Sequence, residues 1–258
     1  MTTTTVPNKS TGVATQPGLA LDITMNGPRK AANGGFAAGT FAVLTGGTAK
    51  VTLRRPVPLA TRFGVGWTPD WYAVMDGLET VATVERSGPF VVEPPARPTY
   101  AQAEEARRNH PFRGVRHTLS DCVVCGPERV GGLRVTPGPL AGHPGILAAP
   151  YDPPSWFSVD GLATPASVWG ALDCVSYPAH LLDEGRIALL GSIAAHRRRE
   201  IAVGEPLIAV GWTLGSGHRS HKTSSALLDE DGAVVASAHA VWVEVKHQRL
   251  ARIAGRWG

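Results

Sequence analysis

The residue that most clearly points to chemistry is Asp173, which lies in the apolar run WGALDCVSYPA. Residues 167–182 are expected to form a helix. A carboxylate within an otherwise apolar helix is costly unless it is paired or has a function. Asp173 is therefore predicted to activate water as a general base, or to attack a carbonyl carbon as a nucleophile. The alternative is a structural aspartate that is bonded to backbone or to an arginine.

A second candidate is the segment Asn33-Gly34-Gly35, at the start of an expected helix over residues 35–44. A helix N-terminus presents free N–H groups and a partial positive charge. Glycine lets a carbonyl group approach that backbone without a side chain in the way. Gly34 and Gly35 are therefore predicted to polarise a carbonyl oxygen as it becomes an oxyanion, with Asn33 as the N-cap or a substrate contact. Close packing of the helix would also explain both glycines.

Hydroxyl and guanidinium groups form two further clusters. The polar run GSGHRSHKTSSALL leads into an expected strand, and Thr223 is the hydroxyl preferred for holding a water; the alternative is a solvated loop. Arg54, Arg55 and Arg199 lie at matching places in the two halves of the chain. Arginine forks suit phosphate oxygens, although exposed charge at strand ends would explain them equally well.

The cysteines form only part of a metal-binding pattern. Cys122 and Cys125 precede Gly-Pro with the spacing of half a zinc site, and Cys174 is remote in sequence. Histidines in range along the chain are His110, His117 and His143. No second C-x-x-C occurs, so the expectation is a tight turn with partly buried thiols, with no metal and no cofactor. Three cysteines also indicate a reducing compartment, and we expect a cytoplasmic protein.

Several function classes lack their signature. The chain has no G-x-S-x-G elbow, no dinucleotide fingerprint and no P-loop. No apolar run approaches the length of a membrane span. The net charge of +4 is not concentrated in a basic stripe, so nucleic-acid binding is not expected. With 43% hydrophobic residues in 258, the sequence predicts a globular protein with a substantial core.

The elements that position these residues come from an internal repeat. RRPVPLATRFGVGW (54–67) matches RREIAVGEPLIAVGW (198–212), with Trp67 opposite Trp212 and Arg54 opposite Arg199. Downstream, DGLETVATVE matches DGAVVASAHA, each an Asp-Gly turn followed by a β-rich run. Each half has one long helix candidate, and a third, short helix is expected over residues 101–108. The economical arrangement wraps an antiparallel sheet round the helices, with two copies paired.

The segments NGGFAAGTFAVLTGG, KVTLRRPVPL and PASVWGALDCVSYPA resemble double hotdog proteins of the acyl-CoA thioesterase II type and related actinobacterial thioesterase-like proteins. The resemblance implies an α+β double hotdog, with two tandem hotdog repeats in one chain forming a pseudo-dimer. Those enzymes use an aspartate on the strand after the second helix, with a threonine and a glutamine from later strands. Near Ser192 this chain reads GSIAAH, and its last strand reads HAVWVEV, so neither the aspartate nor the glutamine is present.

The resemblance implies a thioester hydrolase acting on an acyl-CoA or a carrier-bound acyl group. Asp173 would serve as the base, Gly34 and Gly35 would bind the oxyanion, and the arginines would hold CoA phosphates. Phe36, Trp169 and Tyr177 would contact the acyl chain. Alternatives are a hydratase or dehydratase of acyl thioesters, or a non-catalytic acyl-CoA-binding protein. Paired hotdog units often associate further, so a homo-oligomer is also an expectation.

The expected domain boundaries follow from the repeat and the composition. Residues 1–18 are expected to be a disordered tail, residues 19–95 the N-terminal hotdog, and residues 96–130 a linker that carries the cysteine pair. Residues 131–248 would form the C-terminal hotdog, and residues 249–258 a basic tail. Because only one half offers Gly-Gly and only the other offers a helix aspartate, we expect a single working site.

Overall fold

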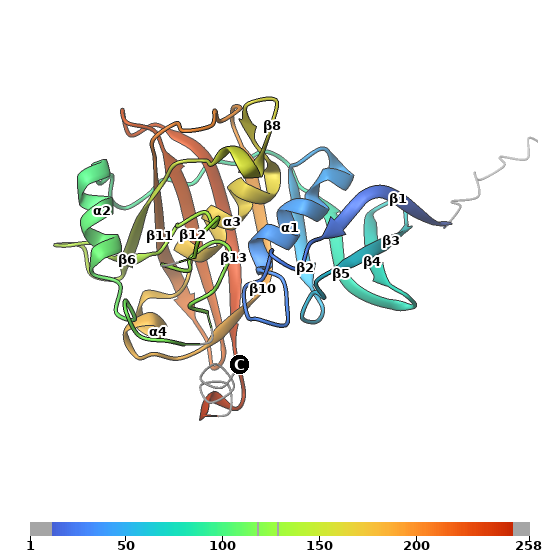
Figure 1. The fold of residues 1–258 in the computed structure, drawn as a ribbon, viewed down its shortest axis with the longest axis horizontal. Helices are drawn as coiled ribbons and strands as arrows, with labels where there is room; N and C mark the ends of the chain where they lie inside the picture. Colours follow the sequence, from blue (N-terminus) through green and yellow to red (C-terminus); the bar gives the residue numbers. More distant parts are fainter. Residues whose placement is uncertain (1–11, 118, 128, 250–258) are drawn as a thin grey trace, which may run out of the picture.

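One eleven-stranded antiparallel sheet organises the chain (Figure 1). The computed structural model describes residues 12–117, 119–127 and 129–249. The strands of the first half are β1 (Gly12–Leu21), β2 (Ala49–Leu53), β3 (Thr61–Trp67), β4 (Trp71–Asp76) and β5 (Glu79–Arg86). Those of the second half are β6 (Gly138–Pro139), β7 (Ile146–Tyr151), β10 (Ala188–Arg197), β11 (Leu207–Ser216), β12 (Ser220–Leu228) and β13 (Val234–Glu244). A separate two-stranded sheet contains β8 (Ser158–Val159) and β9 (Leu162–Ala163).

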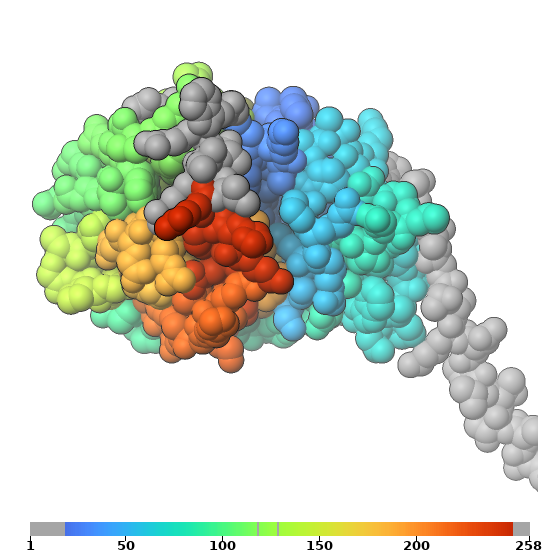
Figure 2. Space-filling model, turned by 90° about the horizontal axis from the view of Figure 1, so that it is seen from below, coloured from blue at the N-terminus to red at the C-terminus, as the bar shows by residue number. Residues whose placement is uncertain are grey.

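The strand order relates the two halves of the sheet. The order is β1-β3-β4-β5-β2-β10-β13-β12-β11-β7-β6. Read outward from the centre, the first half is β2, β5, β4, β3, β1 and the second is β10, β13, β12, β11, β7, so corresponding strands occupy corresponding places. The halves join where β2 pairs with β10, from Ala49 opposite Ala195 to Thr52 opposite Ser192. Figure 2 shows residues of the N-terminal half, in cyan, beside orange and red residues of the C-terminal half.

In the described part of the chain, four α-helices accompany the sheet: α1 (Gly34–Ala42), α2 (Tyr100–Arg108), α3 (Pro165–Val175) and α4 (Ala179–Asp183). Short 3₁₀ helices are η1 (Val43–Thr45) and η2 (Ser155–Phe157). Helices α1 and α3 pack against each other in the middle of the molecule, whereas α2 packs on β6 and β7 (Figure 1). A large antiparallel sheet with few helices fits a hotdog fold.

Glycine brings α1 and α3 unusually close. A Cβ added at Gly35 would lie 2.2 Å from Asp173 Cβ and 2.7 Å from the Trp169 carbonyl oxygen. A Cβ added at Gly39, one turn later, would lie 2.6 Å from the Pro165 carbonyl oxygen. Real carbon atoms do not approach this closely, so two glycines spaced four residues apart form the face that α3 packs on.

Apolar side chains on the inner faces of the sheet enclose these helices. Phe41 of α1 packs edge-on against Phe63 of β3, with ring centroids 5.2 Å apart, and both are buried. In the second half, the buried Tyr151 hydroxyl lies 2.6 Å from the Ser167 hydroxyl of α3. Helix–sheet contact therefore includes aromatic packing in the first half and a hydrogen-bonded hydroxyl pair in the second.

Several sequence expectations are confirmed by these elements. The strand expected at residues 49–53 is β2, and the helix expected at residues 35–44 is α1 with η1. Both Asp-Gly turns join neighbouring strands, and their glycines have positive φ angles, 59° at Gly77 and 78° at Gly232. The helix expected over residues 167–182 is instead divided into α3 and α4, because Pro178 cannot donate a backbone hydrogen bond.

Two expectations about the ends and repeats need correction. The tail expected over residues 1–18 is too long, since β1 begins at Gly12 and pairs with β3; residues 1–11 lie outside the described residues. The basic tail expected over residues 249–258 lies, apart from Arg249, outside them too. Arg198, rather than Arg199, occupies the place of Arg54 in the repeat. Each donates its backbone N–H to the carbonyl of the matching strand, Arg54 to that of Val81 and Arg198 to that of Val235.

Among the described residues, no helix is long and apolar enough to cross a membrane.

Candidate active site

The site is centred where α3 places Asp173 against the start of α1. The Gly35 backbone N–H donates a 2.8 Å hydrogen bond to Asp173 Oδ2. The other carboxylate oxygen, Oδ1, is buried and has no hydrogen-bond partner among the described residues. The close helix packing thus leaves Asp173 buried and half satisfied. Burial raises its pKa to about 7, although the Gly35 N–H bond and the Asn33 side-chain amide oppose that rise.

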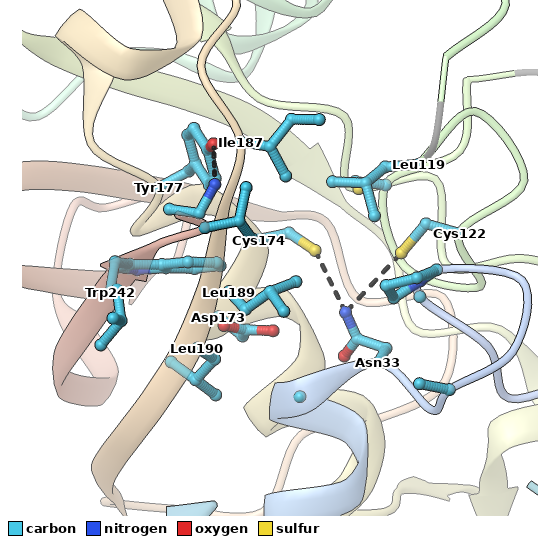
Figure 3. Close-up of a pocket in the computed structure, with 18 of the residues that line it drawn as sticks. Asn33, Leu119, Cys122, Asp173, Cys174, Tyr177, Ile187, Leu189, Leu190 and Trp242 are labelled. Carbon is cyan, nitrogen blue, oxygen red and sulfur yellow. Dashed lines mark hydrogen bonds between the residues drawn. The ribbon is translucent and has the colours of Figure 1, made fainter. Parts of the chain in front are cut away.

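Asn33 connects the helix start to the cysteines. Its side-chain oxygen caps α1 by accepting a 2.8 Å bond from the Phe36 N–H, as the N-cap expectation requires. Its Nδ2 group points away from the helix and donates to Cys122 Sγ at 3.6 Å and to Cys174 Sγ at 3.5 Å (Figure 3). The buried side-chain amide of Asn33 therefore bonds to the start of α1 through its oxygen and to two cysteine sulfur atoms through its nitrogen.

The three cysteines meet beside Asn33. The Sγ atoms of Cys122, Cys125 and Cys174 all lie within 4.8 Å of one another, and all three thiols are free. Cys174 follows Asp173 on α3, so the helix that carries the carboxylate also brings the third sulfur to the pair. Cys174 is remote from Cys122 and Cys125 along the sequence, but the fold places the three sulfur atoms together.

These groups line a cavity of 1120 Å³. Gly34, Asn33, Asp173 and the three cysteines form part of its wall, with apolar contributions from Leu190, Trp242 and others (Figure 3). Its basic lining residues are Lys30, Arg54, Arg55, Arg116, Arg186 and Arg219. A cavity of this size holds a small organic molecule, and its combination of apolar wall and cationic residues suits a ligand with an apolar and an anionic part.

The cavity contains some of the predicted substrate contacts and lacks others. Tyr177, Arg54 and Arg55 line it. Phe36 and Trp169 are buried in the core and are not among its lining residues; Phe36 packs edge-on against Phe157. Arg199 is also not among them, and its guanidinium binds Glu205 through two contacts of 2.5 and 3.1 Å.

Thr223 lies on β12, opposite Ala240 of β13. Its hydroxyl is buried and has no partner among the described residues, and it is not part of the cavity lining. Ser225, two residues on and therefore on the same face, donates to the Leu172 carbonyl of α3 at 2.7 Å. Thr223 therefore faces the α3 side of the sheet, and its water-holding role stays a prediction.

Sequence reasoning considered His110 and His117 only as possible metal ligands and missed Arg186 and Arg219; all four line the cavity. The buried His110 donates through Nδ1 to the Pro137 carbonyl at 2.7 Å, and His117 packs on Phe112 with ring centroids 5.3 Å apart. Burial lowers the pKa of His117 to about 4, and His110 adds to the lowering. Arg186 and Arg219 also border the cavity. None of these stands in a motif, so only the fold could place them there.

Solved structures, two of the following three named as thioesterase superfamily proteins, resemble parts of the chain. A thioesterase superfamily protein is 20% identical with a TM-score of 0.41, over 47% of this chain and 59% of that one. Zebrafish thioesterase superfamily member 2 is 13% identical with a TM-score of 0.40, over 57% and 98%. The E. coli PaaI protein from the phenylacetic acid degradation operon is 12% identical with a TM-score of 0.36, over 39% and 73%. No family model and no curated protein matches the sequence.

Proposed function

We propose that the chain is a double hotdog protein that hydrolyses acyl thioesters, such as an acyl-CoA or an acyl group on a carrier. The observation that carries this proposal is the contact between Asp173 Oδ2 and the Gly35 N–H at the wall of the cavity. It places a buried carboxylate beside a helix N-terminus, the two groups that acyl transfer to water requires. The mirrored strand order supports the doubling.

Each group has a defined step in the reaction. Asp173 takes a proton from a water molecule through Oδ1, the oxygen that has no protein partner among the described residues. The resulting hydroxide attacks the thioester carbonyl carbon, and the C–S bond breaks as the tetrahedral intermediate collapses. The proton on Asp173 then passes to the leaving thiolate, which restores the carboxylate.

The sequence predicted that Gly34 and Gly35 together bind the oxyanion, but only one of their two N–H groups is free to do so in this arrangement. The Gly35 N–H is engaged by Asp173, so in this arrangement it positions the carboxylate. Gly34 is the first residue of α1 and lines the cavity, and the N–H of a first helical residue has no partner within its helix. We assign the oxyanion to the Gly34 N–H, with the helix dipole adding to its attraction.

A single site per chain is supported by the helix positions that correspond in the two halves. Where α1 begins with Gly34, α3 begins with Pro165, which has no N–H to donate. Where α3 has Asp173 as its ninth residue, α1 has Ala42 as its ninth. The second location therefore lacks both the donor and the carboxylate, and titration should find one ligand per chain.

The surroundings of Asp173 do not favour the alternatives. A hydratase would use a histidine next to the carboxylate, but no histidine hydrogen bond in the described part of the chain reaches Asp173; His196, for instance, bonds Thr48. A purely structural aspartate in a binding protein would be fully hydrogen-bonded, whereas Oδ1 has no partner in the described structure.

The test measures thiol release from acyl-CoAs of varied chain length. Asp173→Asn keeps the shape of the side chain and is expected to lower the rate at least ~100-fold, as the loss of a general base does. Asp183→Asn is the matched control, because Asp183 is an exposed carboxylate at the same cavity and should leave the rate unchanged. Equal rates for wild type and Asp173→Asn would refute the mechanism, and no release from any acyl-CoA would favour a binding protein.

A further inference from the structure

The three-cysteine cluster has a geometry that the proposed hydrolysis does not use. A zinc ion binds thiolate sulfur at about 2.3 Å, so a tetrahedral site holds its sulfur atoms about 3.8 Å apart. The Sγ atoms of Cys122, Cys125 and Cys174 are all within 4.8 Å of one another. Side-chain rotations that move each sulfur by less than about 1 Å would bring all three into bonding distance of one ion.

The backbone of the Cys122–Cys125 turn supports metal binding by Cys122 Sγ. The Val124 N–H donates to Cys122 Sγ at 3.4 Å, and the Gly126 N–H donates to the Cys122 carbonyl at 2.9 Å. A Cβ added at Gly126 would lie 2.7 Å from the Cys122 and Ser120 carbonyl oxygens, so this turn requires glycine. The backbone thus closes tightly beneath the first sulfur and directs an N–H group at it.

Asn33 adds further donors to the same sulfur atoms. Its Nδ2 group reaches Cys122 Sγ and Cys174 Sγ, at 3.6 and 3.5 Å (Figure 3). N–H groups that point at sulfur favour the thiolate, the form that binds metal, over the weakly accepting thiol. Outer donors of this kind orient and tune metal ligands. No ion pair of the described residues involves the neighbouring Asp173, so no side-chain cation is salt-bridged to it there.

Three sulfur ligands leave one tetrahedral position for a further group. All three cysteines line the cavity, so that position faces the space in which a ligand would bind. Sites with three protein ligands and one exchangeable position are typical of zinc that contacts substrate, whereas structural zinc has four protein ligands. Thiolate ligands select soft or borderline cations over Mg²⁺ or Ca²⁺.

We propose that Cys122, Cys125 and Cys174 bind one Zn²⁺ ion as thiolates, and that its fourth position accepts the sulfur of a thiol in the cavity. Binding releases the three thiol protons to solvent and involves no oxidation. The proposal does not depend on hydrolysis by Asp173, because it concerns equilibrium binding of the ion.

Titration of the full, reduced chain with Co²⁺, a spectroscopic substitute for Zn²⁺, tests the proposal. We expect one Co²⁺ per chain, with sulfur-to-cobalt charge-transfer absorption, and displacement by one Zn²⁺. Cys174→Ser and Cys125→Ser should each weaken binding at least ~100-fold, whereas Asn33→Ala, which removes an outer donor, should weaken it about 10- to 100-fold. His143→Ala, at an exposed histidine between β6 and β7, is the control and should bind like wild type. Circular dichroism verifies that each variant is folded, and Cys125, the least buried of the three, gives the safer substitution.

Addition of coenzyme A as the thiol should then change the charge-transfer spectrum, because a fourth sulfur joins the ion. Absence of stoichiometric Co²⁺ binding, or binding that survives both cysteine substitutions, would overturn the proposal. A disulfide found in place of metal binding, as a mass loss of two hydrogens, would overturn it as well. The two proposals can fail separately. If wild type releases no thiol from acyl-CoA, the proposed hydrolysis fails; if Asp173→Asn nevertheless binds Co²⁺, the metal site stands.

Discussion

Replacement of Gly35 by alanine tests how closely the two central helices must pack. The new Cβ would lie 2.2 Å from Asp173 Cβ and 2.7 Å from the Trp169 carbonyl oxygen. Since ordinary contact between these atoms is over 3.4 Å, α1 and α3 would have to separate by roughly 1 Å. Overpacking of this kind costs about 1–3 kcal/mol, and the backbone oxygen cannot rotate away, so we take about 3 kcal/mol. Alanine regains about 1 kcal/mol of helix propensity.

The net loss for Gly35→Ala is therefore about 2 kcal/mol of unfolding free energy. At about 2–4 °C per kcal/mol for a chain of this size, the melting temperature should fall by roughly 4–8 °C. Calorimetry measures this directly. Gly88→Ala is the matched control, because an added Cβ there meets no atom within 4 Å, and it should melt within about 2 °C of wild type. A Gly35→Ala protein that melts with or above wild type would refute the account of helix packing.

Further predictions concern buried polar groups. His117 has a folded pKa of about 4 against 6.5, so the folded protein binds fewer protons than the unfolded chain between these values. The unfolding free energy should thus be insensitive to this group above pH 6.5 and should fall as the pH decreases to about 4. Denaturant titrations across that range should show a shallower fall in the unfolding free energy of His117→Gln than in that of wild type. An equal fall in both proteins would contradict the lowered pKa of His117. Glu244 is buried between Arg186, at 2.5 Å, and His221, at 2.9 Å. Because Arg186 is partly exposed, Glu244→Gln should cost only about 2 kcal/mol, less than the loss of a fully buried pair, and calorimetry showing no loss would disprove the pairing. Thr223→Val removes a buried hydroxyl without a partner in the described structure, so denaturation should show about 1 kcal/mol of added stability; a destabilised variant would reveal a bond to that hydroxyl.

The sequence predicted those elements whose residue pattern is local. β2 alternates between inner and outer faces, and the Asp-Gly turns at Asp76 and Asp231 join strands as expected. β12 was read only as a polar run leading into a strand, because Thr223, Ser224 and Ser225 are all buried and leave no alternation to detect. The start of β1 at Gly12 was missed because its threonine and glycines resemble those of the tail.

The candidate site could be predicted only in part, because its contacts join distant segments. The approach of Asp173 to Gly35 was anticipated from two helices that each carried one unusual feature, and the structure places these residues 2.8 Å apart. Cys174 was not connected to Cys122, since nothing local marks a helix cysteine as the neighbour of a turn so far away in the sequence. The cavity residues Arg186 and Arg219 depend likewise on how strands end, which single-sequence patterns do not fix.

The pairing of β2 with β10 determines how the two halves of the sheet unfold. This junction, from Ala49 opposite Ala195 to Thr52 opposite Ser192, is the point at which the backbone ladder passes from one half of the sheet to the other. The strands on both sides of it carry buried side chains that touch the paired helices. Amide protons of Val51 and Ile193 should therefore exchange with solvent only when the whole sheet unfolds, whereas that of Gly138 in the outermost strand β6 exchanges by local fraying. Slow exchange at the middle of the sheet would identify its two halves as one cooperative unit.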